Sequence, residues 1–217
     1  MYTVSDLFDL NHTLAKDYLS GFTWPWEALG GIKALIVSLG EKLEGYTQVS
    51  PQVWVHPSAK VAPTAFLGAP CIIGPETEVR HCAFIRGSAL VGAGCVVGNS
   101  VELKNVILFD GVQVPHYNYV GDSILGYKSH MGAGAVTSNV KSDKTPVTVR
   151  NGDERMETGL KKMGAMLGDH VEVGCNSVLN PGTIIGPNSN VYPLSSVRGC
   201  VPAGSIYKTG GVIAVKK

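Results

Sequence analysis

Hydrophobic residues recur at every sixth position through much of this chain. Between residues 55 and 103 the series has no exception: Val55, Val61, Leu67, Ile73, Val79, Ile85, Val91, Val97 and Leu103. A small or β-branched residue follows each of them four positions later, as Cys71 and Thr77 do. A period of six fits neither a helix nor one continuous alternating strand. It is typical of a solenoid in which each hexad forms a short strand and a turn, and three hexads complete a coil.

The hexads predict the layout of an all-β solenoid. The aliphatic residues should point into a narrow core, and the small residues should keep that core from overfilling. The period returns at Leu125 and Met131, and again from Leu167 to Val197. We therefore expect a solenoid over residues 51–204. The polar segment 138–165 has no hexad pattern, so we expect it to leave the coil and rejoin it as a long loop, and such loops are usually functional.

The hexad frame slips once. The interval from Leu103 to Leu125 is not a multiple of six, because it holds three hexads and four further positions. Inside this interval lie residues 115–122, PHYNYVGD, where Pro115 takes a place that a regular coil would give to an aliphatic residue, and His116 follows it. Our interpretation is that the repeat is scaffold and that its interruption carries the chemistry.

Residues 1–50 show helical signals instead of hexads. Ser5 and Thr13 are candidate N-caps, and residues 23–27, TWPWE, combine the cap candidate Thr23 with a proline in the first turn. We predict a small helical cap or linker segment here. Residues 205–217 form a C-terminal tail, and both pieces are available to cover the open ends of the solenoid, which would otherwise expose strand edges.

Composition narrows the function classes. The chain has 217 residues and a formal net charge of +1, which gives no basic excess for nucleic acid. The longest apolar run, residues 34–39, is too short to span a membrane, and the N-terminus has no signal-peptide layout. Five cysteines without a CxxC pair argue against disulfides or a zinc site. We expect them to be small buried residues of a cytoplasmic protein.

Four sequence features make the chain resemble a known family. They are NSVELK at 99–104, VPHYNYVGD at 114–122, GAGA at 132–135 and Asn139. With the hexads, they resemble the left-handed parallel β-helix of the acetyltransferase half of bifunctional N-acetylglucosamine-1-phosphate uridyltransferase/glucosamine-1-phosphate acetyltransferases, and of the archaeal sugar-1-phosphate nucleotidyltransferase/acetyltransferases. The resemblance covers about residues 53–197. The left-handed sense comes from the resemblance alone, because ordinary crossovers are right-handed.

The resemblance implies an activity and an assembly. It implies an N-acyltransferase that uses acetyl-CoA as co-substrate on an amino-sugar phosphate such as glucosamine 1-phosphate. It also implies a homotrimer with sites between subunits, and no metal. Residues 24–29, WPWEAL, resemble the linker between the two halves of the relatives. Residues 1–50 are too few for a nucleotidyltransferase domain, and no Gly-rich nucleotide loop is found, so we expect that domain to be absent.

The resemblance also assigns roles to residues around the acceptor. His116 matches the general base that takes a proton from the sugar amine, a task suited to imidazole. Arg86 and Lys104 match phosphate-binding cations. Tyr119 matches a sugar-phosphate contact, and Asn139 matches a substrate contact where the loop leaves the coil.

Two further positions match the acetyl-CoA side of the family site. Ala133 and Cys175 correspond to the lining of the acetyl-CoA channel. Lys141, Lys144 and Lys208 are candidates to meet a phosphate of the substrate or of the coenzyme. Two positions depart from the family pattern: His130 replaces an asparagine before the GAG, and Val140 replaces a tyrosine after the loop asparagine.

Two other functions remain open on the sequence. The departures at His130 and Val140 are compatible with a non-catalytic trimeric platform that binds sugar nucleotides beside a nucleotidyltransferase. A zinc-dependent carbonic anhydrase of the γ type also uses this fold. It needs three histidines, whereas here His81 and His116 are present, Gly121 stands five places after His116, and no third ligand is evident.

Overall fold

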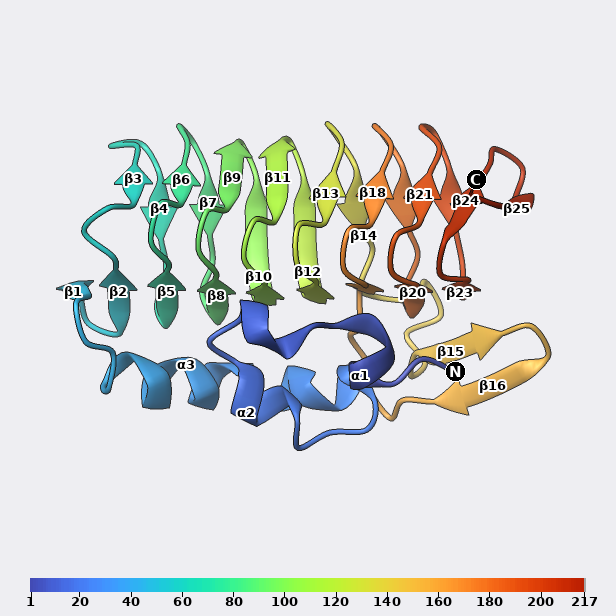
Figure 1. Cartoon of the computed structure of the whole chain (residues 1–217), viewed down its shortest axis with the longest axis horizontal. Helices are drawn as coiled ribbons and strands as arrows, with labels where there is room; N and C mark the ends of the chain where they lie inside the picture. Colours follow the sequence, from blue (N-terminus) through green and yellow to red (C-terminus); the bar gives the residue numbers. More distant parts are fainter. Residues whose placement is uncertain (217) are drawn as a thin grey trace.

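The computed structural model describes residues 1–216 and shows a solenoid of parallel strands stacked along the long axis (Figure 1). The predicted β-solenoid with a small N-terminal helical segment is therefore confirmed. Its left-handed sense stays a prediction from the family resemblance.

The solenoid has three faces. Face 1 consists of β2 (Val53–Val55), β5 (Cys71–Ile73), β8 (Ala89–Val91), the second halves of β10 (Glu102–Leu108) and β12 (Tyr119–Leu125), β17 (Ala165–Leu167), β20 (Thr183–Ile185) and β23 (Cys200–Val201). Face 2 consists of β3 (Lys60–Val61), β6 (Glu78–Val79), β9 (Val96–Asn99), β11 (Gln113–His116), β13 (His130–Met131), β18 (Glu172–Val173), β21 (Asn190–Val191) and β24 (Ser205–Tyr207). Face 3 consists of β4 (Phe66–Leu67), β7 (Phe84–Ile85), the first halves of β10 and β12, β14 (Val136–Thr137), β19 (Val178–Leu179) and β22 (Ser196–Val197).

The hexad residues fill the core as predicted. From Ile73 to Leu103 every aliphatic residue of the series is at most 1% exposed. The small residues four positions later, from Cys71 to Val101, are equally buried. Large and small inward side chains thus alternate in the narrow core, which keeps it from overfilling.

The frame slip is distributed differently from the prediction. Leu103 pairs with Ile85, three full hexads earlier, but Val120 pairs with Leu103, one position short of three hexads. The shortening occurs in the turns after Leu103 and Val120, where Asn105 and Asp122 adopt φ of 55° and 48°. Asn and Asp tolerate this left-handed conformation, so each turn closes with one residue fewer. The slip does not lie at Pro115. This proline follows the inward-pointing Val114, and the hexad from Val114 to Val120 has its regular length of six residues.

The N-terminal segment is helical, as predicted. It contains α1 (Val4–Leu7), η1 (Leu10–His12), α2 (Lys16–Leu19), η2 (Pro25–Gly31) and α3 (Ile32–Gly40), followed by β1 (Thr47–Ser50). Thr3 rather than Ser5 caps α1, in a capping box with Asp6. In the TWPWE stretch the helix begins after Trp24, whose N–H donates to Glu27 Oε2 at 2.8 Å.

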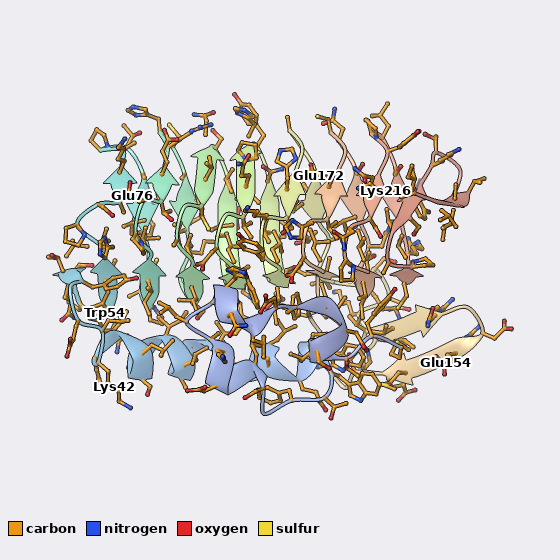
Figure 2. The ribbon with its side chains drawn as sticks, viewed as in Figure 1. Lys42, Trp54, Glu76, Glu154, Glu172 and Lys216 are labelled. Carbon is orange, nitrogen blue, oxygen red and sulfur yellow. The ribbon has the colours of Figure 1, made fainter. Side chains whose placement is uncertain are left out.

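These helices run along face 1 rather than over an end of the solenoid (Figure 1). Face 1 has an outward row of aliphatic side chains that the helices and loops cover; Ile72, Leu90, Ile107 and Ile124 are at most 1% exposed. Trp54 continues this row beside α3, where it packs on Gly40 (Figure 2). The first coil is covered by β1, through antiparallel pairing with β2.

The C-terminal boundary is later than predicted. β24 still pairs in parallel with β21, so the solenoid continues through Tyr207 instead of ending at residue 204. β25 (Ile213–Val215) then turns back antiparallel to β24 and covers the last strand edge of face 2. Lys217 lies outside the described residues.

The excursion contains regular structure that its polar sequence does not suggest. It leaves the coil after Thr137 and returns at Ala165, and it forms a hairpin of β15 (Thr148–Asn151) and β16 (Glu154–Glu157). Val147 and Val149 are fully buried at its base, while Glu154 lies on the hairpin away from the solenoid (Figure 2).

The cysteines are only partly as expected. Cys71 and Cys95 are buried and Cys200 is half-buried, but Cys82 and Cys175 are exposed because turn positions of the coil face outward. All five are free thiols. Within residues 1–216, no helix combines the length and apolar character needed to cross a membrane.

Candidate functional site

The residues singled out in the sequence fall on the two long edges that bound face 3, apart from Tyr119, which lies on face 3 itself. We call the turns between faces 2 and 3 the His116 edge; they are residues 80–83, 98–101, 115–118, 132–135, 174–177 and 192–195. We call the turns between faces 3 and 1 the Lys104 edge; they are residues 86–88, 104–105, 121–122, the excursion, 180–182 and 198–199. Face 3 separates the two edges.

Three predicted residues stack in one column on the His116 edge. The N–H of Gly134 donates to His116 O at 3.0 Å, and the N–H of Asn176 donates to Ala133 O at 2.8 Å. Consequently His116, Ala133 and Cys175 occupy equivalent turn positions of successive coils. Lys208 continues the same edge directly after β24.

His116 is exposed, and its turn is fixed by a buried asparagine that the sequence analysis missed. Tyr117 takes φ of 52° to turn the chain, and the His116 N–H donates to Asn118 Oδ1 at 3.2 Å. The Asn118 amide is 2% exposed and donates to Gly132 O at 2.8 Å and Ala135 O at 3.0 Å. It thereby ties the coil of His116 to the coil of Ala133. An asparagine at a position otherwise given to small inward residues was the available signal.

Asp122 brings the predicted residues of the Lys104 edge together. Lys104 Nζ lies 2.8 Å and 3.0 Å from the two oxygens of Asp122. Asn139 Nδ2 donates to Asp122 Oδ2 at 2.6 Å and to the Tyr119 hydroxyl at 3.1 Å. Asn105 Nδ2 donates to Asp122 Oδ1 at 3.0 Å. Asp122 is 4% exposed, and its place at the end of the PHYNYVGD stretch did not indicate this role. We call Lys104, Tyr119, Asp122 and Asn139 the Asp122 cluster.

Tyr119 lies along its strand because Gly121 leaves space for its ring. A Cβ at Gly121 would collide with the Tyr119 hydroxyl and would lie 2.9 Å from Asn139 Nδ2. Burial, and after it the charge of Asp122, raises the pKa of Tyr119. The phenol therefore stays protonated at neutral pH and can donate a hydrogen bond.

Arg86 belongs to the coil before Lys104 on the same edge. Its Nη1 lies 2.8 Å from Glu102 Oε1, and this exposed pair raises the pKa of the guanidinium, chiefly through the hydrogen bond. In this arrangement each of the two predicted phosphate-binding cations contacts a carboxylate. An incoming phosphate would have to compete with Glu102 and with Asp122.

The N-terminal segment contacts the cluster. Asn105 Nδ2, which donates to Asp122, also lies 3.2 Å from Leu29 O in η2. The stretch that resembles the family's linker therefore helps to fix the orientation of a side chain next to Asp122.

The two departures from the family pattern lie outside the Asp122 cluster. His130 points outward on face 2, where its Nδ1 lies 2.8 Å from Glu172 Oε2. Val140 is 42% exposed at the start of the excursion. No group of three or more His, Cys, Asp or Glu side chains in residues 1–216 is placed to hold a metal ion. His81 instead contacts Thr64 Oγ1 at 2.9 Å through its Nδ1.

Comparison with known proteins assigns the chain to a family. The family described as GMPPB C-terminal domain matches residues 70–192, more than half of the chain. The chain belongs to this family. The matched region of this GMPPB C-terminal domain protein includes Arg86, the Asp122 cluster and the column of His116, Ala133 and Cys175; Lys208 lies beyond it.

Curated relatives confirm the family resemblance found in the sequence. A bifunctional sugar-1-phosphate nucleotidylyltransferase/acetyltransferase of Sulfurisphaera tokodaii is 34% identical over 48% of this chain and 26% of its own length. A bifunctional protein GlmU of Methanococcus maripaludis is 28% identical over 93% of this chain and 50% of its own. The chain thus spans half or less of the length of these relatives.

Solved structures of distant similarity are also found. The acetyltransferase domain of PglB from Neisseria gonorrhoeae, in complex with acetyl coenzyme A, aligns with a TM-score of 0.35 and 17% identity over 74% of this chain and 55% of that chain. A hexapeptide transferase family protein from Anaplasma phagocytophilum aligns with a TM-score of 0.45 and 13% identity over 75% of this chain and 78% of that chain.

Proposed function

We propose that this protein is an N-acyltransferase that transfers an acetyl group from acetyl-CoA to an amino-sugar phosphate such as glucosamine 1-phosphate. One observation carries the proposal: face 3 is bounded on one edge by an exposed histidine and on the other by Arg86 and the Asp122 cluster. Relatives named as nucleotidylyltransferase/acetyltransferases support it.

The chemistry follows from these residues. The neutral imidazole of His116 accepts a proton from the sugar amine as the amine nitrogen attacks the thioester carbonyl. The new C–N bond forms, the C–S bond breaks, and the thiolate of CoA leaves and takes up a proton. Arg86 and Lys104 bind the phosphate through charge-assisted hydrogen bonds. Tyr119 and Asn139 hold the sugar between the phosphate and the base.

Acetyl-CoA would lie along the His116 edge. Ala133 and Cys175 continue the column above His116 and offer small side chains that permit close approach of the pantetheine chain. Lys208, at the end of the same edge, would meet a coenzyme phosphate. This placement brings the thioester to the base from the C-terminal direction.

A neighbouring copy would complete the site in a homotrimer. His116 and Lys104 lie at opposite edges of face 3, and Gly121, the strand neighbour of Lys104, is five residues beyond His116. An extended chain of that length spans at most roughly 17 Å, and a copy of the chain packed on face 3 would bring the His116 edge of one subunit to the Lys104 edge of another. The exposed Phe66, Phe84 and Val178 on face 3 offer an apolar surface for such packing.

The experiment measures acetyl transfer by a His116→Ala variant. Glucosamine 1-phosphate and related amino-sugar phosphates serve as acceptors, and the free thiol released from acetyl-CoA is the readout. We expect kcat to fall at least about 100-fold, the usual contribution of a general base. His81→Ala is the matched control, because His81 is exposed on the same edge two coils away. Unchanged transfer in His116→Ala would contradict the mechanism.

A non-catalytic platform is the second candidate, favoured by His130 and Val140 at positions where the family pattern has asparagine and tyrosine. Titration calorimetry with acetyl-CoA separates the two functions. An acyltransferase must bind the coenzyme, whereas a sugar-nucleotide-binding platform that lacks coenzyme binding would give no heat with acetyl-CoA and would bind a sugar nucleotide.

A further inference from the structure

A second group of cations lies beyond the Asp122 cluster, where the excursion hairpin meets the Lys104 edge. A pocket of about 180 Å³ opens there, lined by Lys141, Thr148, Arg150, Pro181, Arg198 and Gly199. We call it the hairpin pocket. The proposed acetyl transfer uses none of its lining residues.

Two glycines in successive coils let the hairpin approach closely enough to form the pocket. Gly199 has φ of 75°, and a Cβ there would lie 2.8 Å from Arg150 O. Gly182 has φ of 81°, and a Cβ there would lie 2.9 Å from Val147 Cγ1. Any larger residue would push β15 away from the coil. The close approach sets Arg150 beside Arg198, although the two lie far apart in the sequence.

The side chains that line the pocket carry a net positive charge. Its lining contains three cations and no carboxylate. Lys141 is paired with Asp143 at 3.3 Å, but within residues 1–216 neither Arg150 nor Arg198 forms an ion pair. In the hairpin, Arg155 stands directly opposite Arg150, and Glu157 stands opposite Thr148.

We propose that the hairpin pocket binds a phosphate group. Guanidinium forks match the oxygens of a phosphate, and Thr148 adds a hydroxyl that can donate. The volume is below the roughly 300 Å³ at which pockets for drug-sized ligands begin. The pocket therefore takes a phosphate group itself, either free or as the terminal group of a larger molecule that extends into solvent.

The two arginines of the hairpin pocket lie beyond the Asp122 cluster, and Lys141, two residues after Asn139, lies between them and the cluster in the sequence. Thr137, two residues before Asn139, pairs with Leu179 in the next coil. Leu179 pairs in turn with Val197, which directly precedes Arg198. Arg198 is therefore two coils from Asn139, which corresponds to about 9 Å along the axis. Phosphate binding here does not depend on the acyltransferase proposal.

The test is titration calorimetry of the full chain with inorganic phosphate at constant ionic strength, with chloride as the reference anion. We expect Arg150→Gln and Arg198→Gln each to weaken phosphate binding on the order of tenfold, as loss of a charge-assisted hydrogen bond implies. Lys161→Gln is the matched control, since it removes one charge from the same excursion outside the pocket and should leave binding unchanged. Coenzyme A and glucosamine 1-phosphate as alternative titrants distinguish a free phosphate from the phosphate of a larger ligand.

Phosphate bound at the predicted sugar-phosphate site must be told apart from phosphate in the hairpin pocket. The Arg86→Gln variant should keep the binding event that Arg150→Gln weakens. The proposal is wrong if the Arg150→Gln/Arg198→Gln double variant binds phosphate as the wild type does, or if Arg86→Gln removes all phosphate binding. The acyltransferase proposal is tested by acetyl transfer and not by phosphate binding, so its failure would leave this result unaffected.

Discussion

Asp122 shapes the Lys104 edge in two ways. Its left-handed backbone shortens the turn by one residue, which brings the end of β12 into register one position early. Its carboxylate then accepts hydrogen bonds from Lys104, Asn105 and Asn139. The backbone irregularity and the polar cluster are therefore properties of the same residue.

We expect Asp122→Ala to lower the free energy of unfolding by about 2–3 kcal/mol, because it leaves a half-buried lysine and two amides without their acceptor. Glu102→Ala is the matched control, since it breaks the exposed Arg86 pair and should cost less than about 1 kcal/mol. Urea unfolding of both variants measures the difference. Equal losses in the two variants would show that the Asp122 cluster contributes nothing beyond a surface ion pair.

The cysteines give a second prediction at this scale. Burial raises the pKa of Cys71 and of Cys95 to about 12, so neither forms a thiolate at neutral pH. We expect an alkylating reagent at pH 8 to modify the exposed Cys82 and Cys175 in the native protein and to leave the buried pair intact, as read by peptide mass spectrometry.

Acetyl-CoA should protect Cys175 from this reagent, because Cys175 lies in the column proposed for the coenzyme. Cys82 is the internal control. It is exposed on the same edge, two coils from His116 in the N-terminal direction, whereas Cys175 lies in the C-terminal direction. Equal protection of both thiols, or of neither, would contradict the proposed coenzyme path.

Single residues were predictable from the sequence only where a motif marked them. His116 and Tyr119 stood out through spacing, and the structure places them at an edge and on the face beside it. Asp122 and Asn118 did not stand out, because their importance depends on burial and on partners from other coils. Contacts between coils cannot be read from a sequence. The available signal was a polar residue, such as Asn118, at a position where the repeat has small ones.

At the scale of elements, two aspartates fasten the N-terminal segment to the solenoid. Asp169 accepts hydrogen bonds from the N–H of Asp9 at 2.7 Å and of Tyr127 at 2.8 Å. Asp110 accepts from the N–H of Ala93 at 2.7 Å, and its own N–H donates to His12 O at 3.0 Å. Burial is the largest influence on both carboxyls and raises their pKa above the ordinary value of 3.8.

This direction gives a pH prediction for Asp169→Asn. A raised pKa means that the folded state binds the proton more tightly than the unfolded state, so the carboxyl contributes most to stability when protonated. That contribution is lost as pH rises from 3.8 through the folded pKa. We therefore expect the stability deficit of Asp169→Asn, relative to wild type, to be larger near pH 3.5 than at pH 7.

Urea unfolding at the two pH values measures this deficit, with Asp153→Asn at the exposed hairpin tip as the control, for which we expect little change. A deficit that stays constant or grows with pH would show that the fastening of the N-terminal segment does not involve this titration.

The elements themselves were largely predictable. The hexads located the strands of all three faces, because a residue buried in a stacked coil must repeat with the coil. The position of the helices was not predicted, although a signal existed: Trp54, Ile72 and Leu90 form an outward apolar row that repeats once in every three hexads. A row of that kind requires a cover along one face. The hairpin was missed because its polar strands bury only Val147 and Val149 at the base.

For the whole molecule, the helices leave faces 2 and 3 open, and face 3 carries two exposed phenylalanines. Phe66 and Phe84 lie against each other with ring centroids 5.6 Å apart, and they are 58% and 43% exposed. Our proposed trimer buries this face.

We expect Phe84→Lys to convert a trimer into monomers, because a charge in an apolar contact is costly to desolvate. Light scattering measures the mass, and circular dichroism checks that the solenoid persists. Val215→Lys is the control, since Val215 is 84% exposed on the terminal strand and away from face 3. A trimer that survives Phe84→Lys would place the contact elsewhere and would also weaken the shared-site arrangement.

The excursion has a wider meaning for how this scaffold can change. Leu125 pairs with Leu167, seven hexads later instead of the three of a regular coil, while Tyr119 of the same strand pairs with Val136 before the departure. The parallel pairing of the strands therefore continues across the insertion without interruption. The stacking of the coils therefore does not depend on the length of the excursion. The fit of the hairpin does depend on the next coils, because Gly182 and Gly199 admit it. A different insertion would bring other ligands to the Lys104 edge once those two turns had changed with it.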